Sequence, residues 1–103
     1  MLRLKAGVKL DKLHYKMLPV LVEAEKIYAE EGHDLWITSG MDGVHSANSL
    51  HYRDDICRAI DLRTRFFTTA ERKLVCLKLK KVLGREYDVV DEEDHFHIEY
   101  DPK

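Results

Sequence analysis

The sequence predicts a single α+β domain with two helices and a small, mainly antiparallel sheet. Two segments carry apolar residues at steps of three and four, as amphipathic helices do. Four or five shorter segments alternate apolar and polar residues or form short apolar runs, which is typical of strands. The 103 residues suffice for one domain, residues 1–103, with a modest core.

The first half of the chain is expected to form a strand or extended arm, a helix and a second strand. The arm is "LRLKAGVKL", and the second strand is "DLWITSG", with Trp36 in the core. Residues 13–31 form the helix, with Pro19 near its first turn and Gly32 as its C-terminal cap. Its apolar face is expected to comprise Leu13, Met17, Leu21, Ala24, Ile27 and Tyr28.

The second half is expected to add a strand, a helix and two further strands. Residues 39–50 are rich in turn formers and predict a loop, and "CRAIDLR" then alternates, with Asp61 on the side opposite Ile60 and Leu62. Thr68 stands three residues before Glu71, the capping-box spacing, and opens a helix that ends at Gly84. We expect its core-facing stripe to comprise Leu74, Leu77 and Val82. The strands "YDVV" and "HFHIEY" follow, joined by the acidic turn "DEED".

Composition limits the classes of partner. The net charge is −2 with neutral histidines, and a nucleic-acid-binding surface would need a clustered basic face, so we expect no nucleic acid. No apolar run approaches the length of a membrane span, so we expect no membrane. Cys57 and Cys76 are expected to be reduced packing residues. The N-terminal segment lacks the apolar core of a secretory signal, so we expect synthesis in the cytoplasm. Separately, we expect the protein to be a monomer.

Three residues are candidate ligands of one Zn²⁺ ion: His51, Asp61 and His97. A catalytic zinc takes three protein ligands, commonly imidazole nitrogens and a carboxylate oxygen, and leaves a fourth position open. Asp61 and His97 lie on expected strands, which hold ligands more rigidly than loops do. Asp61 also follows apolar residues, and a carboxylate facing a core is costly unless it is paired or bound to a metal.

A carboxylate and a second histidine lie beside the last of these ligands. Asp94 stands three residues before His97, at the turn into its strand, and is the candidate general base. The other carboxylates of that turn are possible substitutes: Glu92 and Glu93. His95 shares a strand face with His97, and we expect it to contact the developing oxyanion or to orient the water.

Several alternatives remain open at this stage. Ser49 is expected to orient His51 through a hydrogen bond. Cys57 lies on the same side of its segment as Asp61 and is an alternative, less favoured ligand. His45 is either a polar group of the cleft or an ordinary loop histidine. The acidic turn "DEED" is a weaker candidate for calcium, because hard cations prefer clustered carboxylates.

Three stretches together resemble a known family: "ITSG", "HSANSLHYRDDICRAIDLR" and "DHFHIEY", between residues 35 and 100. They are similar to family fifteen of the metallopeptidases, the zinc D-alanyl-D-alanine carboxypeptidases and L-alanyl-D-glutamate endopeptidases. The same stretches are similar to small members of the family carried by tailed bacteriophages and prophages. The resemblance implies the zinc-site fold also found in the Hedgehog signalling domain, with ligands His51, Asp61 and His97 and an acidic base at Asp94.

The resemblance further implies hydrolysis of peptide bonds in the stem peptides of bacterial peptidoglycan, during phage lysis or cell-wall remodelling. Without a signal peptide, the chain would reach the wall by another route, such as host-cell lysis or a virion. Two departures from the family favour the alternative of an inactive, zinc-stabilised binding module, such as a virion component. The loop between His51 and Asp61 is longer, and the arginine after the "SG" turn is missing. The candidate replacements for that arginine are His45, Arg53 and Arg63.

Overall fold

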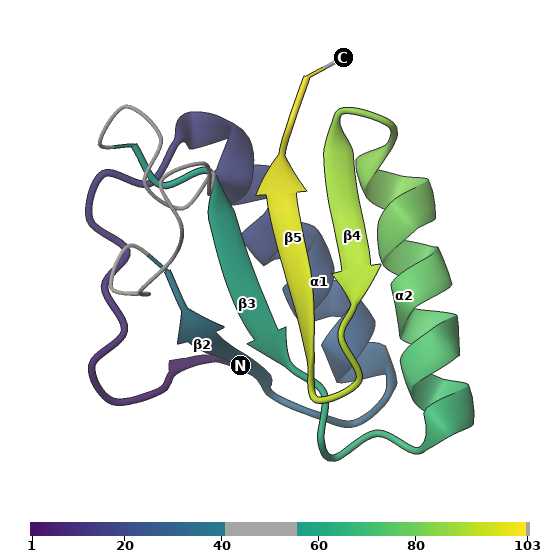
Figure 1. The fold of residues 1–103 in the computed structure, drawn as a ribbon. Helices are drawn as coiled ribbons and strands as arrows, with labels where there is room; N and C mark the ends of the chain where they lie inside the picture. Colours follow the sequence, from purple (N-terminus) through teal and green to yellow (C-terminus); the bar gives the residue numbers. More distant parts are fainter. Residues whose placement is uncertain (41–55, 103) are drawn as a thin grey trace.

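The computed structural model describes residues 1–40 and 56–102, and its elements follow the order expected from the sequence. The helical segments are a short 3-10 turn η1 (Tyr15–Met17), α1 (Leu18–Glu30) and α2 (Thr69–Leu83). The strands are β1 (Leu2–Leu4), β2 (Leu35–Ser39), β3 (Ala59–Arg63), β4 (Tyr87–Asp91) and β5 (His95–Tyr100). The α+β class is therefore confirmed (Figure 1). None of the helices in the described residues has both the length and the apolar character that crossing a bilayer requires.

The five strands form one sheet in the order β1-β2-β3-β5-β4. The pairing is mostly antiparallel, as the sequence predicts, and only β1 and β2 run parallel. The two strands that carry the candidate ligands, β3 and β5, are direct neighbours near the middle of the sheet. Side chains from distant parts of the sequence are thereby brought together on rigid elements.

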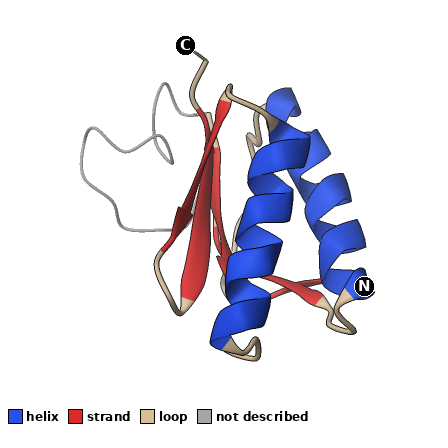
Figure 2. Cartoon of the chain, turned by 90° about the vertical axis from the view of Figure 1, so that its right-hand side faces the viewer, coloured by secondary structure: helices blue, strands red, loops and turns tan. Residues whose placement is uncertain are grey.

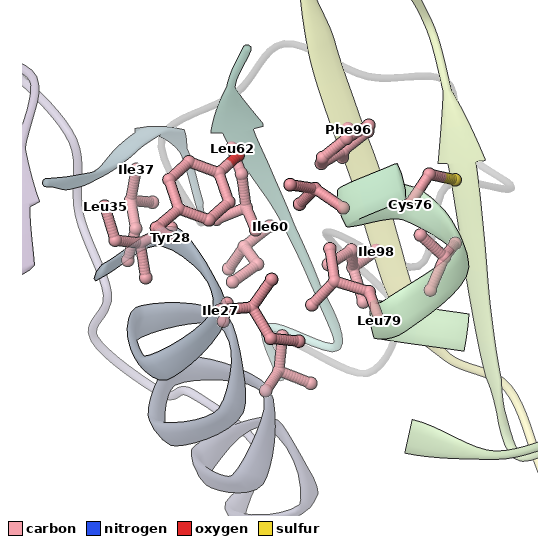
Figure 3. Packing of buried hydrophobic residues seen from close by; sticks show 14 of the residues in the cluster. Ile27, Tyr28, Leu35, Ile37, Ile60, Leu62, Cys76, Leu79, Phe96 and Ile98 are labelled. Carbon is pink, nitrogen blue, oxygen red and sulfur yellow. The ribbon is translucent and has the colours of Figure 1, made fainter. Parts of the chain in front are cut away.

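Both helices cover the same face of the sheet, so the molecule has two layers (Figure 2). The strand alternation sends Ile60 and Leu62 of β3, and Phe96 and Ile98 of β5, toward the helices, where they are fully buried (Figure 3). The polar residues between them face the other side of the sheet, because successive side chains of a strand alternate. We call the side turned away from α1 and α2 the distal face.

Helix α1 has the expected ends of proline and glycine, but the expected start at residue 13 is wrong. Leu13 forms an isolated β-bridge with Cys57 and lies before the helix, and the 3-10 turn η1 precedes α1. Pro19 lies in the first turn, where no intrahelical N–H bond is lost, and Gly32 follows the helix with a φ of +79°, a conformation that favours glycine. Its buried residues are Val20, Ala24, Ile27 and Tyr28. The Tyr28 hydroxyl donates a hydrogen bond of 2.8 Å to the carbonyl of Arg63, so α1 anchors the end of β3 directly.

Helix α2 begins as expected but faces the sheet differently. The Thr68 side chain accepts from the backbone N–H of Glu71, and the Glu71 side chain accepts from that of Thr68, so the capping box is confirmed. The expected core stripe is wrong, because Leu74, Leu77 and Val82 are 45%, 65% and 47% exposed. The buried residues are instead Val75, Cys76 and Leu79. Both sets of residues have helical spacing, but the stripe that is buried is the one next to the expected stripe.

The Tyr28 hydroxyl offers a test of how β3 is held in place. We expect Tyr28→Phe to lower the free energy of unfolding by about 1 kcal/mol, because it removes one buried hydrogen bond and leaves the Arg63 carbonyl without that donor. Urea denaturation measures the change. Tyr15→Phe is the matched control, because Tyr15 is exposed, and its stability should change by less than about 0.5 kcal/mol. Equal stability of the two variants would show that this bond does not hold β3.

Candidate metal centre on the distal face

Asp61 and His97 meet on the distal face, as the sequence predicts for two ligands of one ion. They are directly opposite each other in the antiparallel pairing of β3 with β5. The distance from Asp61 Oδ1 to His97 Nδ1 is 2.9 Å. Their side chains are only 14% and 22% exposed, so the pair is largely withdrawn from water. The alternation of two apolar strands places both side chains on the face opposite the core.

The second ring nitrogen of His97 is also occupied, by a residue that sequence reasoning did not assign. His97 Nε2 lies 2.7 Å from Glu99 Oε1, two residues along the same strand. The hydrogen bond with Asp61 raises the pKa of His97, burial acts in the opposite direction, and the bond with Glu99 raises it further. A signal for Glu99 exists in the sequence, because the strand alternation places it on the face that carries His95 and His97.

Asp94 and His95 form a second pair at the start of β5. Asp94 Oδ1 lies 2.6 Å from His95 Nδ1. The Asp94 carboxylate is 81% exposed, so one of its oxygens contacts His95 and the group as a whole is open to water. His95 stands opposite Arg63 in the strand pairing, the next position on the same face after the pair formed by Asp61 and His97.

The turn that carries Asp94 is docked onto the end of β3. The backbone N–H of the buried Thr64 donates to the carbonyl of Asp94 over 3.2 Å, and the Thr64 hydroxyl donates to the carbonyl of Glu93 over 2.6 Å. Glu93 itself has a φ of +73°, which marks a tight reversal. These bonds fix the position of Asp94 relative to β3, and hence to Asp61 on the same strand.

The remaining candidate residues are distributed as follows. His45, Ser49, His51 and Arg53 lie outside the described residues, so the third expected ligand stays a prediction. The described candidates Asp61, Arg63, Asp94, His95 and His97 all belong to β3, to β5 or to the turn before β5.

Two residues have environments that bear on the sequence expectations. Cys57 is fully buried in the hydrophobic core, and its thiol donates to the carbonyl of Ala59 over 3.1 Å. This environment is that of a packing residue, and neither Cys57 nor Cys76 forms a disulfide in the described residues, as expected. The expected core position of Trp36 is wrong, because its side chain is only partly buried and lies against the guanidinium of Arg63, 4.8 Å from its ring centre. That contact belongs to the distal face.

Three carboxylates form a further group of possible metal ligands: Asp88, Glu99 and Asp101. One oxygen of each lies within 4.8 Å of the others, and all three residues are partly buried. This cluster could hold a metal ion. Carboxylate oxygens alone suit hard cations such as Ca²⁺ or Mg²⁺, whereas a mixed imidazole and carboxylate set suits zinc. Glu99 belongs to this cluster and also contacts His97.

Comparisons of the chain with protein-family models, with curated proteins and with solved structures found no match.

Proposed function

We propose that the protein is a zinc-dependent peptidase that hydrolyses stem peptides of bacterial peptidoglycan. The observation that carries the proposal is the contact of 2.9 Å between Asp61 and His97 on paired strands. These residues come from separate motifs of the sequence resemblance, and 36 positions separate them along the chain. Asp94, the expected base, contacts His95 of the same strand face, and its backbone is bound to Thr64 at the end of β3.

The two described ligands fit a zinc ion. Zinc in proteins is bound by imidazole nitrogens and carboxylate oxygens, and one atom of each kind, His97 Nδ1 and Asp61 Oδ1, lie 2.9 Å apart here. One nitrogen of His97 faces Asp61 and the other faces Glu99. A histidine that binds zinc usually donates its remaining N–H to a carboxylate or carbonyl, which fixes the ring orientation. His51 would complete the set, and it is proposed on the sequence motif alone.

Each described residue has a defined part in the proposed reaction. A zinc ion held by this set would act as a Lewis acid and would lower the pKa of a water molecule to about 7. Asp94 has one oxygen against His95, and its other oxygen is free to accept the proton of the attacking water and to return it to the leaving amine. His95 donates a hydrogen bond to the oxyanion that develops on the scissile carbonyl.

The proposed activity has two candidates for the peptide bond that is cleaved. By resemblance, it is either the D-alanyl-D-alanine bond or the L-alanyl-D-glutamate bond of the stem peptide. The same resemblance places the activity in phage-driven lysis or in cell-wall remodelling. A zinc-stabilised module without turnover is the competing possibility, because the arginine expected after the "SG" turn is missing.

The proposal is tested by measuring metal and hydrolysis on the same preparation. Elemental analysis of the purified protein should find one zinc per chain, and incubation with peptidoglycan should release new amino termini. Zinc without new amino termini would favour the non-catalytic module. A chain that takes up no zinc, even when zinc is supplied in excess, would contradict the metal centre and the peptidase together.

Glu99 is expected to strengthen zinc binding by orienting His97. We expect Glu99→Gln to weaken zinc affinity by about tenfold, because the amide keeps the shape but removes the charge that holds the ring. Competition with a chromophoric chelator measures the affinity. Glu92→Gln is the control, because Glu92 is exposed on the preceding turn and should leave the affinity unchanged. Equal affinities for both variants would show that Glu99 does not act on the metal centre.

A further inference from the structure

Helices α1 and α2 expose large apolar side chains on the surface that is turned away from the sheet (Figure 2). The stripe of α2 that the sequence predicts as core belongs to this surface, because Leu74 and Leu77 are exposed there. We call the surface the outer helical face and define it by its exposed apolar residues: Leu18, Val22, Leu74, Leu77 and Val82. Apolar side chains that remain in contact with water favour association with another surface of the same kind.

A groove of about 590 Å³ separates the two helices at this surface. Ile27 of α1 and Val82 of α2 supply its apolar lining, and charged residues of both helices surround them: Glu23, Lys26, Glu30, Lys78 and Lys81. Helices pack by inserting the side chains of one helix into the grooves of another. The outer helical face therefore has the shape of a surface that accepts further helices.

The two helices carry opposite charge. Helix α1 contains three glutamates and one lysine, whereas α2 contains five lysines and arginines and one glutamate. That glutamate, Glu71, is occupied by the capping box. Among the described residues one ion pair joins the helices, Glu30 with Lys78 at 4.0 Å, and Lys81 has no ion pair there. Most of the positive charge of α2 is therefore available to an acidic partner.

A second copy of the chain has the matching distribution of charge. The helices lie side by side and antiparallel, and their 13 and 15 residues give them similar lengths of about 20 and about 23 Å (Figure 1). A twofold axis that runs parallel to the helices, between two copies, places α1 of each copy against α2 of the other. Such an interface uses the same surface twice, as homodimers commonly do. Each acidic helix then contacts a basic one, and the four helices form an antiparallel bundle.

We propose that the outer helical face binds a second copy of the chain, so that the protein is a twofold-symmetric dimer with a four-helix bundle between its two sheets. The proposal departs from the monomer expected from the sequence, and it does not depend on the proposed peptidase function. The distal face lies on the other side of each sheet, so Asp61 and His97 of both copies remain accessible. An anionic membrane would also attract the lysines of α2, but Glu23 and Glu30 of α1 at the same groove would oppose it.

Sedimentation equilibrium over a series of protein concentrations tests the dimer. The unmodified protein should approach twice the chain mass of 12.1 kDa, and Leu77→Glu should dimerise at least about tenfold more weakly. Leu77 is 65% exposed, so the variant should keep its fold, which circular dichroism checks. Val90→Glu is the matched control, because Val90 is an exposed apolar residue of the distal face, and its mass should equal that of the unmodified protein. The mass of one chain at every concentration, or undiminished dimerisation of Leu77→Glu, would overturn the proposal.

A mixing experiment tests whether α1 of one copy contacts α2 of the other. The variant Lys78→Glu/Lys81→Glu makes the α2 side of the groove acidic, and Glu23→Lys/Glu30→Lys makes the α1 side basic. Each variant alone should dimerise at least about tenfold more weakly, because both contacts of its dimer then join like charges. The mixed dimer joins opposite charges at both contacts, so an equimolar mixture should regain the mass of a dimer. A mixture that dimerises no better than its two components would overturn the pairing of α1 with α2.

Vesicles of phosphatidylglycerol distinguish a second copy from a membrane as the occupant of this face. If the unmodified chain is a monomer that sediments with the vesicles, and Leu77→Glu does not sediment with them, the dimer is overturned. The outer helical face would then be a surface for anionic lipid.

Discussion

Replacement of His97 by alanine is expected to remove zinc and hydrolysis together. The substitution deletes one of the two described candidate ligands, and it also removes the imidazole that contacts the carboxylates of both Asp61 and Glu99. Loss of a ligand should weaken zinc binding by more than the roughly 10- to 100-fold that the loss of a supporting residue costs. Elemental analysis after dialysis should find less than one tenth of the normal zinc content, and no new amino termini should be released.

The structural cost of this substitution has to be separated from its effect on the metal. Asp61 is only 14% exposed, so loss of the imidazole beside it is expected to lower stability by about 1–3 kcal/mol in addition. His97→Gln is therefore measured beside His97→Ala, because glutamine keeps hydrogen-bonding capacity but replaces the imidazole ligand. Both variants should lose zinc, whereas only the alanine variant should be strongly destabilised. Normal zinc content in either variant would contradict the role of His97.

The strands of this fold follow from the sequence because their alternation is strong and their neighbours are clear. In β3, apolar residues alternate with Asp61 and Arg63, and the structure places the two sets on opposite faces as expected. In β5 the same alternation separates the histidines from Phe96 and Ile98. Successive side chains of a strand point to opposite faces, so once the apolar residues are buried, the residues between them must lie on the other face.

The face of α2 could not be predicted with equal certainty, because the helix is apolar on more than one side. Its residues Leu74, Val75, Cys76 and Leu77 are consecutive, so two adjacent stripes each satisfy helical spacing. Volume and the curvature of the sheet decide which stripe is buried, and neither is visible in a sequence. Trp36 illustrates the same limit, because its large apolar ring also suits a surface that stacks with Arg63.

In the candidate site, too, some contacts can be predicted from the sequence and others cannot. Ligand types and their spacing in the sequence predict that Asp61 and His97 come together, and strand pairing places them 2.9 Å apart. The support from Glu99 follows from the alternation of β5, which places it on the face of His97. The docking of the Asp94 turn onto Thr64 depends instead on how that turn returns to the sheet. Contacts of that kind join positions with no shared motif, so a single sequence carries little sign of them.

The second large effect is expected from Asp94→Asn, which should retain zinc and abolish most hydrolysis. Asparagine has the size of aspartate and keeps an oxygen that can accept from His95, so the turn should hold its position on Thr64. It has no carboxylate to accept a proton from the attacking water. Loss of a general base lowers the rate by about 10²- to 10⁴-fold. The rate of release of amino termini and the zinc content of the same preparation measure the two properties.

The possible outcomes of Asp94→Asn assign the base unambiguously when neighbouring carboxylates are changed in parallel. Glu92→Gln and Glu93→Gln alter exposed residues of the same turn, and both should retain activity within about twofold, because surface substitutions of this kind rarely disturb a fold. If the asparagine variant loses zinc, Asp94 is a ligand and the proposed division of roles is wrong. If it keeps full activity while one of the glutamine variants becomes inactive, the proton is accepted by that glutamate, and the 81% exposure of Asp94 reflects a surface position alone.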